Sequence, residues 1–284
     1  MSIVYLNGNY LPVEEARVSV LDRGFTFADA VYEVIPVYAE SVFRVDEHLQ
    51  RLDNSLNAIH ISNPLSGVQW KQVFRDVLEK NPSSFDRSLY VQVTRGVSER
   101  DHLKTSNLQP TVFVMSREAG DRDYSKGVSA ITHEDIRWDY CHIKTTALLA
   151  NVLLKQKAQA ANGAFETILV KNGKVTEGAA SNVFVVKDKT VMTAKKDGSV
   201  LPGITRDLLL ELLEFANISF IEKSVSLAEL LSADEVWVSS SSVGVAPVTE
   251  IDGHPVADGK VGELWKVANQ LFLDFKADPT MLNK

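Results

Sequence analysis

The chain has 284 residues, of which 45% are hydrophobic and 24% are charged, which is typical of a soluble globular protein with room for two domains. Its formal net charge of −7 argues against general binding to nucleic acids or anionic membranes, although a local basic pocket for a phosphate remains compatible. The single cysteine, Cys141, cannot form an internal disulfide, which favours a reducing cytoplasm.

The first part of the chain mixes strands and helices. Residues 1–9 predict a strand and an Asn-Gly turn rather than a signal peptide, and no apolar run approaches the ~20 residues of a membrane span. Asp46 is expected to be the N-cap of a first helix, and a second helix is expected to stop at Asn81-Pro82. The strands predicted in this part cover residues 31–38, 41–45, 89–95 and 111–115.

The polar stretch 118–123 is expected to link an N-terminal α/β domain, residues 1–117, to a C-terminal domain, residues 124–284. In the second domain, a helix after Lys144 is expected to end near Asn162-Gly163, and Ser226 to Glu229 forms a capping-box pattern. Two further helices are predicted after Thr205 and over residues 261–275. The strands predicted here cover residues 127–131, 165–171, 181–187 and 235–238.

Lys144 stands between a short predicted strand and the aliphatic run 147–154. A lysine near apolar groups ionises less readily, so its amine becomes available as a nucleophile, which is what a Schiff-base lysine requires. The alternative is an exposed lysine just before a helix N-cap at Thr145 or Thr146.

Three other features suit a phosphate, and each has an ordinary alternative. The start of a helix at Ile204-Thr205 offers free N–H groups and a positive dipole end, or Thr205 is simply its N-cap. The serine run 239–242 offers hydroxyl and N–H donors, or it is a polar loop. Arg51 lies away from the apolar face of its helix, where it either contacts an anion or is solvated.

Motifs in a fixed order carry a family resemblance. Lys144 is followed by Thr176-Glu177-Gly178, by Ser181-Asn182 and by 203–206, which reads Gly-Ile-Thr-Arg. This ordered set resembles the class IV aminotransferases, the fold type IV enzymes that use pyridoxal 5′-phosphate. The resemblance covers nearly the whole chain. It implies a two-domain α/β fold of the α+β type, with a smaller N-terminal α/β domain and a larger C-terminal pseudo-barrel domain that carries the cofactor lysine.

The resemblance also implies roles for individual residues. Lys144 would hold the cofactor as a Schiff base, and Glu177 would keep the pyridine nitrogen protonated so that the ring withdraws electrons from the substrate. Arg137 would support Glu177 or the ring. The phosphate is expected at Arg51, Ile204, Thr205, Ser240 and Ser241.

Residues 27–33 resemble the family's Gly-Asp-Gly-Val-Tyr-Glu strand, with Ala28 and Ala30 in place of both glycines. The family's tyrosine lines the active site near the Schiff base and the substrate carboxylate, which is the role expected of Tyr32. The alternative is a cross-strand aromatic residue. Ser242 is expected to contact the substrate as well.

Arg100 and His102 are the substrate signal, because side chains two residues apart in an extended loop converge on one side and can clamp a carboxylate. The alternative is an ordinary polar loop. Arg-x-His after Val-Thr-Arg-Gly resembles the D-amino acid transaminases, in which this pair reaches across a homodimer interface. The implied reaction moves an amino group between a D-amino acid and a 2-oxo acid at an active site shared by two copies.

Other functions remain open on the sequence. Enzymes of the same fold act on branched-chain L-amino acids or on R-amines, and the aminodeoxychorismate lyases share the lysine and the glutamate. A non-enzymatic pyridoxal phosphate carrier would need no substrate clamp, so Arg100 and His102 argue against it. The histidines show no metal-ligand spacing such as His-Glu-x-x-His, and no metal is expected.

Overall fold

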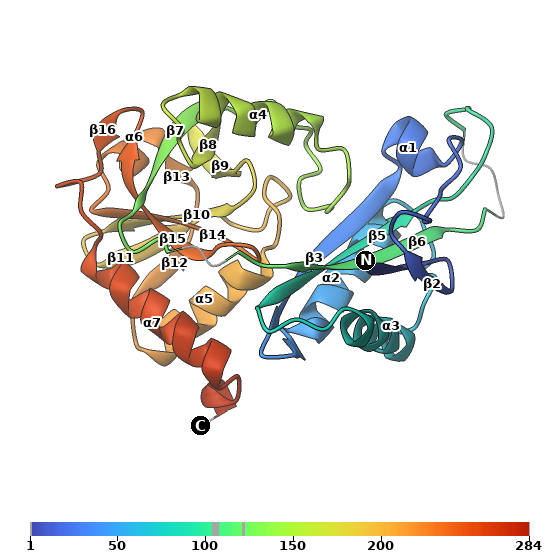
Figure 1. Cartoon of the computed structure of the whole chain (residues 1–284). Helices are drawn as coiled ribbons and strands as arrows, with labels where there is room; N and C mark the ends of the chain where they lie inside the picture. The colour runs from blue at the N-terminus through green and yellow to red at the C-terminus, as the bar shows by residue number, and fades with distance from the viewer. Residues whose placement is uncertain (1, 104–107, 121–122, 284) are drawn as a thin grey trace. The chain divides into compact units, whose positions relative to one another are not determined.

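The computed structural model describes residues 2–103, 108–120 and 123–283 (Figure 1). By their internal contacts, Met1–Gly120 and Ile143–Leu148 form one compact unit, unit 1, and Asp121–His142 and Leu149–Lys284 form unit 2. The segment Ile143–Leu148, expected in the second domain together with its lysine, therefore groups with unit 1. The domain boundaries at 117 and 124 stay a prediction, and residues 121 and 122 of the expected linker lie outside the described residues.

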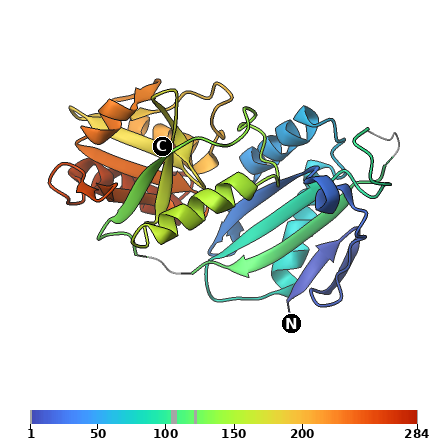
Figure 2. The same cartoon turned by 90° about the horizontal axis from the view of Figure 1, so that it is seen from above.

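Unit 1 is a six-stranded antiparallel sheet with the order β2-β1-β6-β5-β3-β4. Helices α2 and α3 cover one face of this sheet (Figures 1 and 2). The strands are β1 (Ile3–Leu6), β2 (Asn9–Pro12), β3 (Ala30–Tyr38), β4 (Ser41–Val42), β5 (Arg87–Thr94) and β6 (Thr111–Glu118), and the helices are α1 (Arg23–Phe27), α2 (Val45–Ala58) and α3 (Gly67–Lys80).

The core of unit 1 is built from alternate residues of its strands and from residues three or four apart on its helices. Alternate residues of β3 and β5, such as Ile35 and Leu89, are fully buried, and they pack in one cluster with Leu56 of α2 and Phe74 of α3. Each such side chain contributes about 1.5–3 kcal/mol by leaving water. The strands and helices expected in this part are therefore confirmed, with shifted ends.

The expected N-cap at Asp46 is wrong. Helix α2 begins two residues earlier than expected, at Val45, and its N-cap is Arg44, whose φ of 45° is left-handed. Asp46 lies in the first turn of α2, where the positive end of the helix dipole stabilises its negative charge. Its carboxylate also forms an ion pair of 2.6 Å with Lys71.

Unit 2 is a ten-stranded mixed sheet whose main path is β12-β11-β10-β14-β15-β7-β8-β9-β13, with β16 paired to β15. Its strands are β7 (Val128–Glu134), β8 (Glu166–Lys171), β9 (Lys174–Gly178), β10 (Asn182–Lys187), β11 (Thr190–Thr193), β12 (Phe220–Glu222), β13 (Val225–Ser226), β14 (Glu235–Ser240), β15 (Gly244–Ile251) and β16 (His254–Pro255). Its helices are α4 (Leu149–Ala160), α5 (Ile204–Phe215), α6 (Leu227–Leu231), α7 (Glu263–Ala277) and the short 3-10 helix η1 (Met281–Asn283).

The sheet of unit 2 curls back on itself. Strands β9 and β10 lie at separate places in the strand order, yet a short turn joins them, and within it the Gly178 N–H donates to the Ser181 carbonyl at 2.6 Å. This curled path fits the expected pseudo-barrel. The capping box at Ser226 and Glu229 is confirmed as the start of α6.

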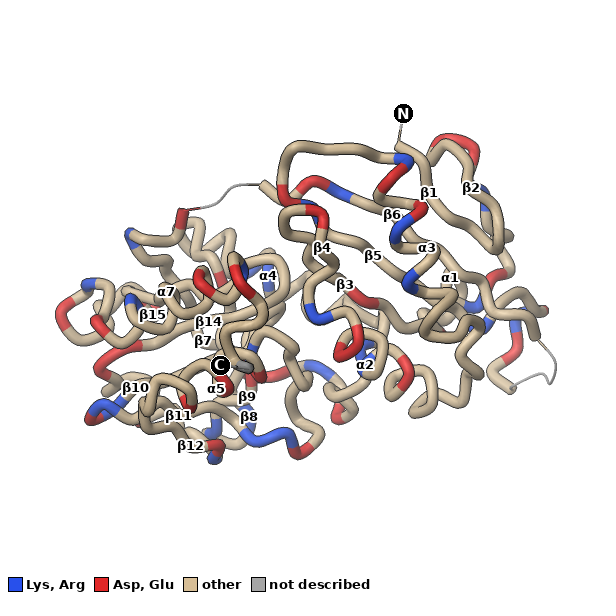
Figure 3. The backbone as a smooth tube through the Cα atoms, turned by 90° about the horizontal axis from the view of Figure 1, so that it is seen from below, with Lys and Arg blue, Asp and Glu red and all other residues tan. Residues whose placement is uncertain are grey.

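The helix expected directly after Lys144 starts only at Leu149. The N–H groups of Thr145 and Thr146 donate instead to the carbonyls of Ile143 and Ala30, within unit 1, so these threonines are not its N-cap. None of the helices in the described part of the chain combines the length and apolar character needed to cross a lipid bilayer. Basic and acidic residues are interspersed along the tube of both units (Figure 3).

A half-buried carboxylate anchors the last helix of unit 2. Glu235 accepts from the N–H groups of Leu264 (2.9 Å) and Trp265 (2.8 Å), which are free donors at the start of α7, and from the indole N–H of Trp237 (2.9 Å). A Cβ on Gly262, the N-cap of α7, would lie 1.9 Å from the Glu235 carboxyl carbon, so a larger residue there would displace this carboxylate. Strand β14 and helix α7 are joined through this one side chain.

Glu235→Ala should destabilise the protein by about 2–3 kcal/mol, because the fully buried Trp237 and the first turn of α7 both lose their acceptor. Urea denaturation measures the change. The matched control is Glu263→Ala, which removes a first-turn carboxylate whose side chain is 86% exposed, and should cost no more than about 0.5 kcal/mol. Equal losses from the two substitutions would contradict the anchoring role.

Candidate active site

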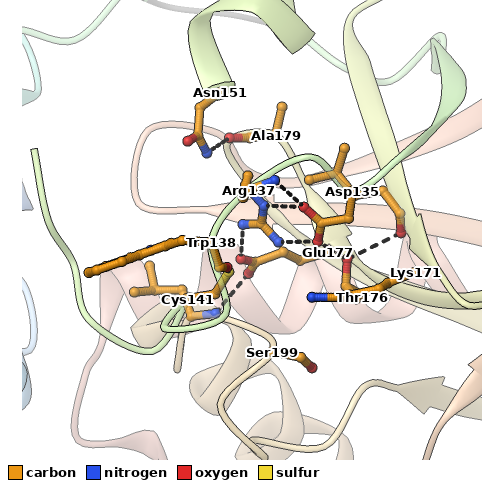
Figure 4. Close-up of polar contacts among 12 residues, drawn as sticks. Asp135, Arg137, Trp138, Cys141, Asn151, Lys171, Thr176, Glu177, Ala179 and Ser199 are labelled. Atoms are coloured by element: carbon orange, nitrogen blue, oxygen red, sulfur yellow. Dashed lines mark hydrogen bonds and ion pairs between the residues drawn. The ribbon is translucent and has the colours of Figure 1, made fainter. Parts of the chain in front are cut away.

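A buried arginine lies between two carboxylates in unit 2 (Figure 4). Arg137 donates from Nε and Nη2 to the two oxygens of Asp135, at 2.9 and 2.8 Å, and from Nη1 to Glu177. Thr176, one residue before Glu177 on β9, donates to Asp135 at 2.8 Å. All three charged side chains are at most 8% exposed. The sequence predicts that Arg137 supports Glu177 or the cofactor ring, and its guanidinium contacts Glu177 in the structure.

The second oxygen of Glu177 connects the cluster to the start of α5. It accepts from the Leu201 N–H at 2.9 Å and from Asn182 Nδ2 at 3.2 Å, and Asn182 also donates to the Leu201 carbonyl. Gly203, rather than Thr205, is the N-cap of α5, and a Cβ on Gly203 would lie 2.0 Å from Asn182 Oδ1. Asn182 pairs in register with Ser239. Residues 177, 182, 203 and 239 thus meet at one end of the sheet.

The charges in this cluster do not balance. Burial works against the Asp135 carboxylate, but the Arg137 guanidinium holds its pKa below the ordinary value. Arg137 is thereby neutralised, and Glu177 carries surplus negative charge in a dry environment. Burial, assisted by the charge of Asp135, raises the pKa of Glu177 from 4.5 to about 7 against the opposing pull of Arg137. Within the described part of the chain, the two carboxylates of this cluster share one cation, Arg137.

In unit 1, Lys144 lies against the first residues of β3. The Tyr32 N–H donates to the Lys144 carbonyl at 2.9 Å, Val31 and Thr145 form an isolated bridge, and the Lys144 N–H donates to Ser55 Oγ at 3.2 Å. The Lys144 Nζ lies 4.3 Å from the centre of the Tyr32 ring. The half-buried lysine is therefore fixed on both sides of its backbone and faces an aromatic surface.

Arg51 belongs to a buried ion-pair network on the same unit. Its guanidinium donates to both oxygens of Glu33, at 2.7 and 2.8 Å, and Glu33 also accepts from His48 Nδ1 at 2.8 Å. Burial would raise the pKa of Glu33, but Arg51 and His48 lower it below its usual range. Burial lowers the pKa of His48, and the charges of Arg51 and Lys144 act in the same direction. Arg51 is thus not a solvated arginine.

Arg100 and His102 lie in the exposed loop after β5 and meet at one aromatic ring. The guanidinium carbon of Arg100 is 5.1 Å from the centre of the Phe27 ring, and the ring of His102 is 5.2 Å from it. The two side chains do converge, as their spacing suggested. Among the described residues of unit 1, neither has a hydrogen bond or ring contact with Tyr32 or Lys144.

Comparison with known proteins decides the family. Residues 30–251 match the family described as "Amino-transferase class IV". The chain is 41% identical to the D-alanine aminotransferase of Bacillus licheniformis over 265 residues, which cover 93% of each chain. It is 38% identical to the D-alanine aminotransferase of Staphylococcus aureus, covering 96% of this chain and 97% of that one.

This chain belongs to the class IV aminotransferases.

Solved structures of the family have the same fold. A branched-chain amino acid aminotransferase of Escherichia coli is similar with a TM-score of 0.89 at 26% identity, covering 96% of this chain and 94% of that one. A second branched-chain amino acid aminotransferase, from T.th., was solved with pyridoxamine 5′-phosphate and has a TM-score of 0.90 at 25% identity, with 97% and 94% coverage. The expected fold type IV α/β architecture is confirmed.

Class IV aminotransferases work with pyridoxal 5′-phosphate, which is therefore the cofactor of this aminotransferase. The unbalanced charge of the cluster is compatible with it. Asp135 neutralises Arg137, so Glu177 is left to pair with one further cation, and a protonated ring nitrogen is a cation of suitable size. Within the described residues, no group of three or more His, Cys, Asp and Glu side chains is arranged for a metal ion.

The other cofactor residues expected in unit 2 lie at the start of α5 and at the end of β14. Ile204 and Thr205 are the first two residues of α5, both buried, where N–H groups are free of helical partners. Ser240 ends β14 and its hydroxyl lies 3.2 Å from that of Ser242, with Ser241 between them. Tyr32, Arg51, Lys144, Arg100 and His102 belong to unit 1.

Several residues that contact the predicted site residues were not predicted from the sequence. Glu33 and His48 were not singled out, although His48 stands three residues before Arg51 on α2 and so shares its face. Glu33 follows Tyr32 on β3, and a charged residue in an otherwise apolar strand was the available signal. Asp135 was not singled out either, although it stands two residues before Arg137 in the sequence. Asn182 stands in the Ser181-Asn182 motif but was given no role, and Phe27 had no comparable signal.

In the cofactor-free protein, Glu177→Gln should remove a pH-dependent part of the stability. Since the folded-state pKa is raised from 4.5 to about 7, the wild-type carboxyl group stabilises the fold fully below pH 4.5, and this contribution is lost as the pH rises through 7. The shift corresponds to about 3 kcal/mol. Denaturant unfolding of both proteins at a series of pH values measures the difference.

The control is Glu15→Gln, which makes the same chemical change at an exposed position and should leave the pH profile unchanged. A difference between wild type and Glu177→Gln that stays constant across this pH range would show that Glu177 is ionised throughout, and the charge argument would then be wrong.

Proposed function

We propose that this aminotransferase moves the amino group between a D-amino acid and a 2-oxo acid. The observation that carries the proposal is the convergence of Arg100 and His102 on one exposed loop. Two cationic or donor side chains at that spacing suit the α-carboxylate that both substrates share. The proposal gains support from relatives named D-alanine aminotransferase, at 38–41% identity over nearly the full chain.

Lys144 is proposed to attach the cofactor and to act on the substrate. When bound, pyridoxal phosphate supplies a carbon that carries the amino group and a conjugated ring that accepts the electron pair left at the substrate α-carbon. The Lys144 amine takes the proton from that α-carbon as a general base and returns a proton as a general acid. Tyr32, whose ring faces the Lys144 amine, limits the positions available to it.

Glu177 is proposed to hold the proton of the ring nitrogen, with Arg137 and Asp135 keeping its carboxylate in place. The phosphate is proposed to bind at a second set of donors that combines positive charge with directional N–H and O–H groups. That set contains Arg51, Ile204, Thr205, Ser240 and Ser241. Glu33 and His48 keep the Arg51 side chain from turning toward solvent.

Stereochemistry is proposed to follow from the carboxylate clamp. If Arg100 and His102 fix the α-carboxylate, with Ser242 as a further contact, only the D-isomer presents its α-hydrogen to Lys144. Arg100 and His102 contact neither Lys144 nor Tyr32 by ring or hydrogen bond within the described chain, which favours a homodimer in which they serve the partner copy. A cytoplasmic location is proposed from the single cysteine.

A substrate panel separates this function from its alternatives. With 2-oxoglutarate as acceptor, the initial rate with D-alanine should exceed those with L-leucine and an R-amine by at least about a hundredfold, since the clamp selects both carboxylate and configuration. Faster turnover of L-leucine or the R-amine would reverse the proposal. Release of pyruvate from aminodeoxychorismate without any amino acceptor would identify a lyase instead.

Lys144→Ala should abolish transamination and the yellow colour of the purified holoenzyme, because the only proposed covalent link to the cofactor is lost. An absorbance scan and a D-alanine assay measure both effects. Lys157→Ala, which removes an exposed lysine from the following helix, is the matched control and should keep colour and rate. Wild-type colour in Lys144→Ala would place the attachment at another lysine.

A further inference from the structure

The loop that carries Arg100 and His102 is held by the residues around α1. The Arg23 N–H donates to the Gly96 carbonyl at 2.8 Å, and its side-chain Nη1 donates to the Asp101 carbonyl at 2.6 Å. Arg23 is only 5% exposed, and Asp29 accepts from its Nε at 2.9 Å. The backbone on both sides of Arg100 is therefore tied to one buried arginine.

Phe27 is where the side chains of this loop gather. Its ring lies 5.1 Å from the Arg100 guanidinium carbon, 5.2 Å from the His102 ring centre and 4.7 Å from the Arg23 guanidinium carbon. Among the described residues, neither Arg100 nor His102 has a hydrogen bond or an ion pair. One aromatic ring is thus the shared contact of the two proposed clamp residues.

We propose that Phe27 is a positioning residue for the substrate carboxylate. A guanidinium contacts an aromatic ring through its planar carbon and leaves the N–H edges directed outward, which is the edge that a carboxylate binds. Without the ring, a long exposed arginine samples many rotamers, and ordering it again for each substrate weakens binding. This inference rests on the proposed carboxylate clamp and adds the residue that pre-organises it.

Phe27 could instead serve only to fill space on a short helix. If Phe27 only fills space, its replacement should lower the stability and kcat without weakening the binding of the substrate carboxylate. A positioning role predicts higher KM for both substrates, because the D-amino acid and the 2-oxo acid each present an α-carboxylate, with kcat nearly unchanged. The split between KM and kcat therefore distinguishes the two.

The test measures steady-state kinetics of the holoenzyme with D-alanine and 2-oxoglutarate. Phe27→Leu should raise both KM values about five- to twentyfold, the loss expected for one or two ring contacts to cations, and change kcat less than about twofold. Phe27→Tyr keeps the aromatic face and should restore near-normal KM. Phe25→Leu is the matched control, because Phe25 lies on the same helix, is 75% exposed and should leave both KM values unchanged.

A double-mutant comparison separates this inference from the proposed function. Arg100→Ala and His102→Ala together should raise KM on their own, and adding Phe27→Leu to them should have little further effect. If the pair of alanines leaves KM unchanged, the clamp itself fails and this inference fails with it. If they raise KM but Phe27→Leu does not, the clamp stands and only the positioning role is overturned.

A loss of kcat and of Tm in Phe27→Leu with unchanged KM would also overturn the proposal in favour of packing. If Phe27→Leu does not accumulate as folded protein, Phe27→Met supplies the same measurement. It replaces the ring with an unbranched apolar side chain of similar bulk, so it removes the aromatic face and keeps most of the packing.

Discussion

One guanidinium is shared by two buried carboxylates in unit 2, and the charge balance of the candidate site depends on this interaction. Arg137 satisfies Asp135 completely and Glu177 only in part, and the cluster is then short of one positive charge. A buried site with this deficit binds a cation more strongly than a balanced one would, because little water is present to screen the attraction. The same deficit explains why the Glu177 carboxyl in the protein alone tends to hold a proton.

Unit 1 also contains a buried carboxylate, Glu33, but this one has its own cationic partner. Glu33 is paired with Arg51 and also receives the His48 N–H, so this carboxylate has a cationic partner on the same unit. Its role is geometric, since a bidentate pair fixes the plane of the guanidinium. The His48 Nε2 is buried without a hydrogen-bond partner among the described residues, and burial lowers the pKa of this imidazole, whose Nδ1 contacts the Glu33 carboxylate.

Much of the fold was readable from the sequence, because long elements repeat one physical pattern many times. The strand at β3 and the helices α2 and α3 follow from the alternation or helical spacing of their buried residues. Helix starts were less predictable. The N-caps of α2 and α5 are Arg44 and Gly203 rather than Asp46 and Thr205. Such positions depend on tertiary contacts, for example the approach of Asn182 to Gly203.

The candidate site shows the same division. Lys144, Glu177 and Arg100 stand in motifs whose order along the chain points to a family, and the family match is now shown. Their partners come from distant parts of the sequence, and no local pattern connects Phe27 with Arg100 or Glu33 with Arg51. Such pairs arise only when the sheet register is set, since that register decides which side chains share a face.

The assignment of Ile143–Leu148 to unit 1 has a consequence for biosynthesis. Residues 1–120 leave the ribosome first, but the amide of Tyr32 and the carbonyl of Ala30 find their partners only in residues 144–146. Until residues 144–146 are added, these backbone groups at the start of β3 lack these partners, next to the buried Val31. The N-terminal half thus emerges as an unfinished sheet, and it is completed by a hexapeptide translated after the first stretch of the other unit has already appeared.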